Sequence, residues 1–231
     1  ATYYIADGRY AGYTFNTPPN GTQYVTINKA TQSDHGTTTG WQSSYGDGQA
    51  LWTDMWYINT GYLIVDGQTR AADWRSGYGF KIAVPSGHAV RFAGSGTLSD
   101  VTLRNLDMQG GGLVGDSITG SAVYAHRTGA ITNLTVQNCH THDFWPDPFV
   151  IGGRNGRAND VTIERCFIDE NNSTSAIHGQ SVADHSASHV TFRYNKVRNP
   201  VGTAVYTVIG WGQVESDLEI YGNVIWNTPG W

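Results

Sequence analysis

The sequence predicts an all-β solenoid, a parallel β-helix in which each turn of the chain stacks on the turn before it. The main observation is an apolar/polar pattern that recurs five times, as VTLRNLDM, LTVQNCHT, VTIERCFI, VTFRYNKV and LEIYGNVI, starting at Val101, Leu134, Val161, Val190 and Leu218. After a first interval of 33 residues, these copies follow at 27–29 residues. Recurrence at a nearly constant spacing of this length is typical of solenoid proteins.

A second strand pattern recurs between these copies, in SAVYAHR, PFVIGGR, SAIHGQS and TAVYTVI, starting at Ser121, Pro148, Ser175 and Thr203. Turns rich in Gly, Asn, Asp and Ser separate the short strands and leave no room for a helix. We therefore expect each strand to pair in parallel with its equivalents in the neighbouring turns, about 4.8 Å away. A two-layer or barrel fold is the alternative, but neither would explain why residues at equivalent positions of successive repeats have similar side chains.

Composition agrees with one large β-domain that spans residues 1–231. Charged residues make up only 14% of the chain, which contains 13 Tyr and 8 Trp, and a disordered chain would be poorer in aromatic residues. The net charge of −5, without a basic stripe, argues against nucleic acid as a partner. No apolar run approaches the roughly 20 residues that a membrane-spanning helix requires.

The first part of the chain, residues 1–99, repeats less regularly than residues 100–231. We expect its strands at residues 24–30, 62–68, 79–84 and 89–94. A long polar loop, residues 31–52, follows the first of them. Loops of this length in a compact domain are usually functional or act as a protective flap.

The two cysteines, Cys139 and Cys166, occupy the sixth position of the first pattern in consecutive repeats. The other copies have Leu106, Asn195 and Asn223 at that position. We expect it to lie at an inward bend, where Asn side chains form a hydrogen-bonded ladder and Cys is a small apolar replacement. Stacked turns would place the two Cα atoms about 4.8 Å apart, which permits either a disulfide or two buried thiols.

Few lysines and four N-glycosylation sequons, at Asn20, Asn133, Asn171 and Asn172, favour a protein that is exported from the cell. The opening residues ATYYIADGRY do not have the charged and apolar regions of an export signal. We therefore expect any such signal to have been removed from the chain.

The stretch YYIADGRYAGYTF, the loop SDHGTTTGWQSSYGDGQA and the repeats VTIERCFIDEN and VTFRYNKVRN resemble secreted proteins of the pectate-lyase-like superfamily. The resemblance covers most of the chain and implies a right-handed parallel β-helix. It also implies that a glycan lies along one parallel sheet, in a groove walled by loops. Because that superfamily includes polysaccharide lyases, glycoside hydrolases and phage tailspikes, the fold does not select an activity.

The second strand pattern is the candidate for the glycan-binding sheet. If Val123, Val150, Ile177 and Val205 point inwards, alternation sends the following residues outwards: Tyr124, Ile151, His178 and Tyr206. Two places further on lie His126, Gly153, Gln180 and Val208. Aromatic rings stack on sugar faces and Arg binds uronate carboxylates or sulfates, although these side chains would also suit a plain solvent-exposed face.

The residue types on this strip favour β-elimination over hydrolysis. Hydrolysis needs two carboxylates, and the four predicted strands contain no Asp or Glu. Elimination needs a cation to neutralise a uronate carboxylate and a base to remove a proton. The candidate catalytic residues are Tyr124, His126, Arg127, Arg154 and His178, and the candidate substrate-binding residues are Gln180 and Tyr206.

No cofactor is assigned to this strip. The resemblance implies that many lyases of this fold hold calcium with several acidic residues on neighbouring turns, and the predicted strands do not contain such a cluster. A denser polar group, His140, His142 and Asp143, follows the Cys139 strand, and two imidazoles with a carboxylate can bind a transition metal. Histidines in turns are also commonly solvated or capping residues.

A structural subunit is the second function that the sequence suggests. The chain opens on ATYYIADG and stops at WNTPGW, without the cap or further turns typical of the resembled family. An uncapped β-helix end exposes backbone groups that can pair with another chain. End-to-end self-association into an extracellular filament or surface layer is therefore the alternative to glycan cleavage, unless the chain is a piece of a larger protein or Trp226 and Trp231 plug the last turn.

Overall fold

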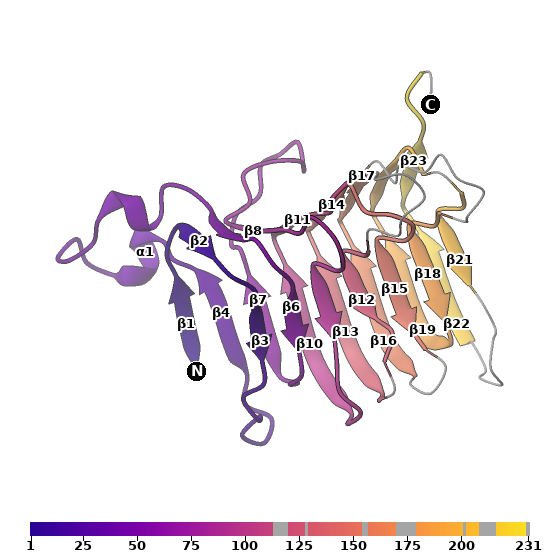
Figure 1. Ribbon diagram of the computed structural model, residues 1–231, viewed down its shortest axis with the longest axis horizontal. Helices are drawn as coiled ribbons and strands as arrows, with labels where there is room; N and C mark the ends of the chain where they lie inside the picture. The colour runs from indigo at the N-terminus through magenta and orange to yellow at the C-terminus, as the bar shows by residue number, and fades with distance from the viewer. Residues whose placement is uncertain are drawn as a thin grey trace.

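The computed structural model describes residues 1–112, 120–127, 129–153, 157–169, 179–200, 202–207 and 216–229. These residues form three parallel β-sheets that run along the molecule, and the chain passes through each sheet once per turn (Figure 1). The right-handed parallel β-helix predicted from the sequence is therefore confirmed. Within the described residues, no helix has the length and apolar character that crossing a membrane requires.

Sheet A contains, in spatial order, β1 (Thr2–Ile5), β4 (Val25–Lys29), β7 (Leu63–Asp66), β10 (Leu98–Arg104), β13 (Ile131–Gln137), β16 (Ala158–Glu164), β19 (Ala187–Arg193) and β22 (Ser216–Tyr221). Sheet B contains β2 (Gly8–Tyr10), β5 (Ala50–Trp52), β8 (Phe80–Ala83), β11 (Leu106–Gln109), β14 (His140–His142), β17 (Phe167–Asp169), β20 (Lys196–Arg198) and β23 (Val224–Trp226). Sheet C contains β3 (Tyr13–Phe15), β6 (Trp56–Ile58), β9 (Val90–Phe92), β12 (Val123–Ala125), β15 (Phe149–Gly152), β18 (Val182–His185) and β21 (Val205–Thr207).

The core of the solenoid consists of apolar side chains that stack from one turn to the next. In sheet A the pairing register places equivalent buried residues directly above one another, as in the row Leu63, Val101, Leu134, Val161 and Val190. Side chains alternate between the two faces of a strand, so every second residue enters this core and the others face outwards. The alternation seen in the sequence is thus the direct cause of the buried rows.

From β10 onwards, a sharp corner of one or two residues joins each strand of sheet A to the next strand of sheet B. The corner residue has a left-handed backbone in successive turns, at Asn105, Asn138, Arg165, Tyr194 and Gly222. Asn tolerates this conformation because its short polar side chain can hydrogen-bond locally, and Gly adopts it without a Cβ penalty. The corner turns the next residue inwards, which explains the sixth position of the repeat.

The inward ladder at that position is confirmed. The amide of Asn195 accepts a hydrogen bond from the Cys166 N–H at 2.9 Å and donates to the Ile163 carbonyl at 3.0 Å. The side chain of Asn223 accepts from the Asn195 N–H at 2.8 Å. Cys139 and Cys166 are fully buried free thiols, so of the two expectations the structure contains the thiols and not the disulfide.

The long loop predicted at residues 31–52 contains a short helix, α1 (Gln32–His35), and a 3-10 turn at Ser43–Tyr45, and its last residues form β5. The hydroxyl of Thr31 caps α1 by accepting a hydrogen bond from the Asp34 N–H at 3.3 Å. This segment extends from the N-terminal end of the solenoid (Figure 1). It therefore does not cover the middle of any sheet.

The structure corrects the predicted register of sheet C. Val123 pairs with Phe149, which pairs with Val182, so Phe149 replaces Val150 as the inward residue of its turn. The strand of the following turn is β18, whereas the predicted strand at residues 175–181 falls largely outside the described residues. The outward row is consequently Tyr124, Val150 and Ala183, and the backbone of Tyr206 pairs with Ala183 in the next turn.

Candidate functional site

The outer side of sheet C carries a strip of aromatic and basic side chains, which we name the sheet C strip: His88, Arg91, Tyr124, His126 and His185. The Tyr124 hydroxyl lies 3.0 Å from Nδ1 of His126. The His88 ring stacks on Tyr124 at a centroid distance of 4.0 Å, and the Arg91 guanidinium lies 5.9 Å from the same ring. The rings of His126 and His185 are 5.8 Å apart. The strip therefore combines a hydrogen-bonded Tyr–His pair with a nearby cation.

The other residues predicted for this site have different positions. Arg127 is buried, and its guanidinium donates hydrogen bonds to the carbonyls of Gly94 and Ala130 at 3.1 and 3.3 Å. Gln180 is also buried, and its backbone N–H donates to the Asp147 carboxylate at 2.8 Å. Arg154 and His178 lie outside the described residues, as does the side chain of Tyr206, whose backbone belongs to β21.

Sequence reasoning missed His88, Arg91 and His185. Arg91 is the central residue of β9 and pairs with Tyr124, so alternation on the predicted strand at residues 89–94 could have placed it outwards. His185 pairs with Gly152 only in the corrected register. In that register β18 contains an acidic residue, Asp184. The expectation that the strands of this sheet contain no Asp or Glu is therefore wrong for β18. The Asp184 side chain is buried and accepts from the Ala187 N–H, so it does not face the strip.

Burial keeps the imidazoles of the strip neutral. It lowers the pKa of His88 to about 4, with a further contribution from the positive charge of Arg91. Burial also lowers the pKa of His126, and burial with the neighbouring His126 lowers that of His185. At neutral pH these rings are therefore uncharged.

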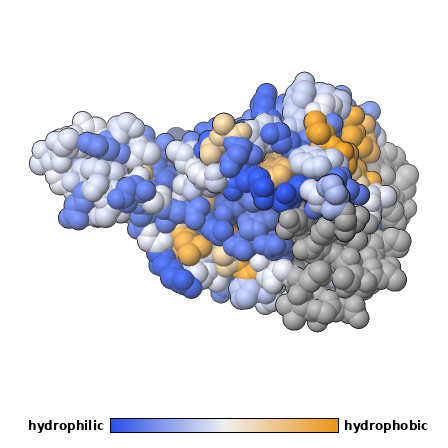
Figure 2. All heavy atoms as spheres, turned by 90° about the horizontal axis from the view of Figure 1, so that it is seen from above, coloured by the Kyte–Doolittle hydropathy of each residue, from blue (hydrophilic) through white to orange (hydrophobic). Residues whose placement is uncertain are grey.

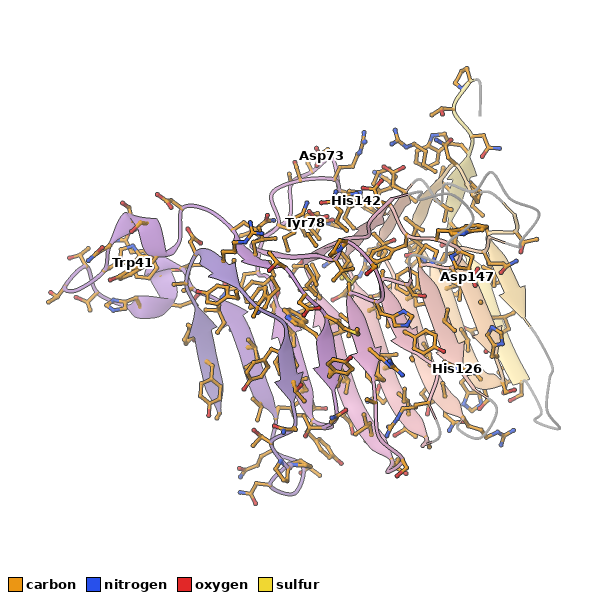
Figure 3. All side chains as sticks on the ribbon, viewed as in Figure 1. Trp41, Asp73, Tyr78, His126, His142 and Asp147 are labelled. Carbon is orange, nitrogen blue, oxygen red and sulfur yellow. The ribbon has the colours of Figure 1, made fainter. Side chains whose placement is uncertain are left out.

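A second polar site lies on sheet B, and we name it the sheet B cluster: Asp107, His140, His142, Asp143 and Asp169. The outward residues of β11, β14 and β17 supply four of these side chains, and Asp143 follows β14 directly. With Asp73, Arg75 and Lys81 they line an open pocket of about 420 Å³. Figure 3 shows His142, Tyr78 and Asp73 on this side of the molecule, and Figure 2 shows hydrophilic residues across the middle of the face seen from above.

Asp107 is the centre of this cluster. Its Oδ1 lies 3.1 Å from Nδ1 of His140 and 3.2 Å from Nε2 of His142, and its Oδ2 lies 3.0 Å from the Lys81 ammonium. Nδ1 of His142 lies 2.7 Å from the Asp143 carboxylate. The structure thus brings His140, His142 and Asp143 together as predicted. The sequence prediction missed Asp107, which the pairing of Asp107 with His140 would have identified.

Neighbouring groups fix the orientation of these side chains. The His140 ring stacks between His142, at 4.5 Å, and Phe167, at 5.5 Å. Arg198 holds Asp169 through two hydrogen bonds of 2.6 and 2.8 Å. Burial opposes protonation of His142, but its hydrogen bonds to two carboxylates outweigh burial and raise its pKa to about 9.

Comparison with known proteins identifies the fold only. No protein-family model matches the chain, and no curated protein matches it. A solved structure from Parabacteroides merdae ATCC 43184, provisionally described as a glycosyl hydrolase, superposes with a TM-score of 0.53 and 8% identity over 87% of this chain and 83% of that one. The GH136 lacto-N-biosidase of Eubacterium ramulus superposes with a TM-score of 0.44 and 11% identity over 92% of this chain, which spans 47% of that protein. At these identities an activity cannot be transferred.

Proposed function

We propose that this chain is a secreted carbohydrate-active β-helix that binds an acidic glycan along sheet C and cleaves it by β-elimination. The observation that carries the proposal is the Tyr124–His126 pair, whose hydroxyl and Nδ1 are 3.0 Å apart beside the exposed Arg91. The description of the P. merdae structure as a glycosyl hydrolase supports carbohydrate as the substrate class. Export is supported by the sequons and the few lysines of the sequence.

The chemistry assigns one role to each group of the strip. Arg91 binds the uronate carboxylate and stabilises the negative charge that develops on it. A neutral base, His126, removes the proton from C5, and the electrons of that C–H bond form the C4–C5 double bond. The C4–O4 bond breaks at the same time, and the Tyr124 hydroxyl supplies the proton that the leaving oxygen requires. The His88 ring supports Tyr124 by stacking on it.

The lyase proposal is tested with purified protein and a panel of uronate-containing and sulfated polysaccharides. Cleavage by elimination produces an unsaturated sugar, so the ultraviolet absorbance of the products should rise with time. We expect His126→Gln and Tyr124→Phe to lower the rate by about 100-fold or more, because positioned acid–base groups contribute that much. His189→Gln is the matched control, since His189 is an exposed histidine on sheet A.

Two results would contradict the lyase proposal. New reducing ends without unsaturated products would indicate hydrolysis. Full activity of the His126→Gln protein would show that His126 is not the base that removes the C5 proton.

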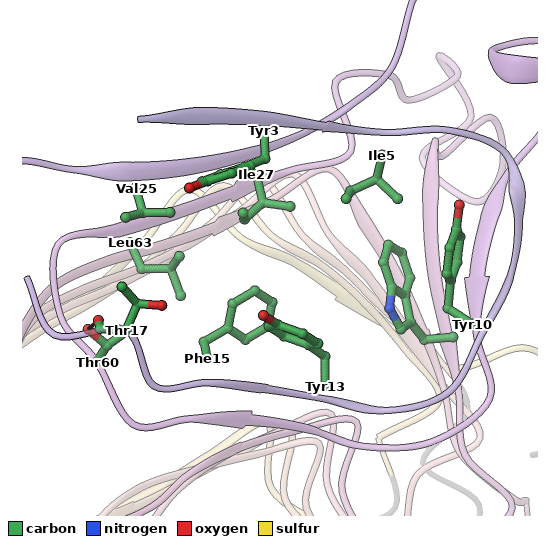
Figure 4. A pocket seen from close by; sticks show the side chains of 11 residues that line it. Tyr3, Ile5, Tyr10, Tyr13, Phe15, Thr17, Val25, Ile27, Thr60 and Leu63 are labelled. Carbon is green, nitrogen blue, oxygen red and sulfur yellow. Dashed lines mark hydrogen bonds between the residues drawn. The ribbon is translucent and has the colours of Figure 1, made fainter.

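Self-association is the second candidate function, and the two ends of the described solenoid favour it. At one end the turn formed by β1–β3 surrounds an apolar cavity of about 450 Å³, into which Ile5, Phe15 and Ile27 point (Figure 4). At the other end Ile220 and Val224 are 47% and 58% exposed. Within the described residues, β1–β3 and β21–β23 are the terminal strands of the three sheets, and a second copy stacked head to tail on these strands would continue each sheet.

A further inference from the structure

We infer that the sheet B cluster is a binding site for a divalent transition metal of the Zn²⁺ class, with Asp107, His140 and His142 as ligands. Two imidazoles and one carboxylate are a donor set that such ions prefer. The three side chains come from two neighbouring strands, and their donor atoms all lie within 4.8 Å of one another. This site is on a different sheet from the proposed glycan groove and does not depend on that function.

The distances within the cluster match a metal centre. Oδ1 of Asp107 lies 3.1 Å from Nδ1 of His140 and 3.2 Å from Nε2 of His142. Bonds of about 2.0–2.1 Å to a tetrahedral Zn²⁺ place neighbouring ligand atoms roughly 3.3 Å apart. The carboxylate oxygen thus already has this separation from each of the two ring nitrogens. The two imidazoles are stacked at 4.5 Å, so they must turn towards each other for both to bind the same ion.

The hydrogen bonds around His142 direct its Nε2 at Asp107. Asp143 accepts the Nδ1–H of His142 at 2.7 Å, so Nε2 is the ring nitrogen that can bind a metal once it gives up its proton. That nitrogen lies 3.2 Å from Oδ1 of Asp107, and a metal ion would take the place of the proton between these two atoms. A carboxylate behind a histidine ligand in this way is the usual outer shell of a zinc site.

The surroundings of His140 lead to the same conclusion. This residue is 6% exposed, and its Nε2 has no hydrogen-bond partner within the described part of the chain. The nearest carboxylate oxygen, on Asp169, is 3.9 Å away. A metal on Nδ1 would leave the proton on Nε2, directed at Asp169, so this ring also would have a carboxylate behind it.

The rest of the pocket leaves one coordination position open. Lys81 binds the second oxygen of Asp107, so Asp107 offers a single oxygen to the ion. Asp73 and Arg75 also line the pocket, and Arg75 lies 3.5 Å from the Asp169 carboxylate. Three protein ligands and an open fourth position characterise zinc sites that bind water or a substrate oxygen.

The proposal is tested on chelator-treated protein by calorimetric titration with Zn²⁺ and by visible absorption with Co²⁺. We expect one equivalent of metal and a Co²⁺ spectrum typical of nitrogen and oxygen ligands. Asp143→Asn should weaken binding by about 10–100-fold, because outer-shell partners typically contribute that much. Asp107→Asn, His140→Gln and His142→Gln should each weaken it further.

His189→Gln is the matched control for metal binding. His189 also lies between two carboxylates, Asp160 at 3.1 Å and Asp217 at 2.8 Å, but it is exposed, so its loss should leave the bound equivalent unchanged. The thermal melt of each variant in chelator verifies folding. If the variants of buried residues do not fold, Asp143→Asn still tests the site, because Asp143 lies at a partly exposed turn. The inference is overturned if the protein binds no stoichiometric metal, if His142→Gln binds as tightly as the natural sequence, or if Co²⁺ shows thiolate charge-transfer bands from the cysteines.

Discussion

At the residue scale, the imidazoles of the sheet C strip make stability depend on pH. The pKa of His88 is lowered to about 4 in the folded chain, against an ordinary value near 6.5 in the unfolded chain. A histidine whose pKa is lowered by folding contributes stability at any pH above the pKa that it has in the unfolded chain. This contribution is lost as the pH falls towards the pKa that the residue has in the folded chain. His126 and His185 are shifted in the same direction.

We therefore expect the midpoint of thermal unfolding to fall between pH 7 and pH 4.5, and His88→Gln to make this fall smaller. Differential scanning calorimetry over that range measures the effect. His189→Gln, which changes an exposed histidine, should show the same change of the unfolding midpoint with pH as the natural sequence. If the unfolding midpoint of the His88→Gln protein changes with pH as that of the natural sequence does, burial of this ring does not contribute to the pH dependence of stability.

Also at the residue scale, alternation along a strand was enough to find Tyr124 and His126, because both lie on one side of a single segment. It failed for Asp107, which meets His140 only through the pairing of β11 with β14. The same limit applies to Arg91 and His185, whose neighbours are set by register and not by their own strand.

At the element scale, the corner between sheets A and B determines which residues the chain accepts. Asn138 has φ of 55°, whereas Thr135 lies in the extended part of β13. We expect Asn138→Val to lower the free energy of unfolding by about 1–2 kcal/mol, because a side chain with a branched Cβ is strained in the left-handed region. Asn138→Gly should change it by less than about 0.5 kcal/mol.

Urea denaturation of these variants provides the measurement. Thr135→Val is the control, since it places the same side chain on an extended strand, where valine is favourable. Equal stability of the Asn138→Val and Thr135→Val proteins would show that the corner conformation does not limit the sequence.

The strands of sheet C illustrate why elements of the right type were placed in the wrong register. β15 and β18 begin 33 residues apart, at Phe149 and Val182, whereas β21 begins at Val205, only 23 residues after β18. Both SAIHGQS and the following VADH contain the short apolar alternation of a strand. The connecting loops absorb the difference in length, so the periodicity of sheet A does not set the position of β18.

At the scale of the whole molecule, the exposed ends predict concentration-dependent association if the chain acts as a structural subunit. Sedimentation equilibrium of the natural sequence should then give a mass that rises above the 25.2 kDa of one chain, while Ile220→Asp remains monomeric because it places a charge on the exposed end. Thr162→Asp, on the lateral face of sheet A, is the control and should still associate. A mass of one chain at every concentration would contradict the subunit hypothesis.

The sequence by itself determined the class of fold, because the alternation of apolar residues specifies the buried face of each strand and the repeat specifies which strands stack. It also determined the inward ladder that contains Cys139 and Cys166. Only the tertiary structure decided which side chains of different turns meet, since loop lengths between turns vary and a shift of register changes every neighbour. The placement of Asp107 between His140 and His142, and of Arg91 beside Tyr124, depends on that register.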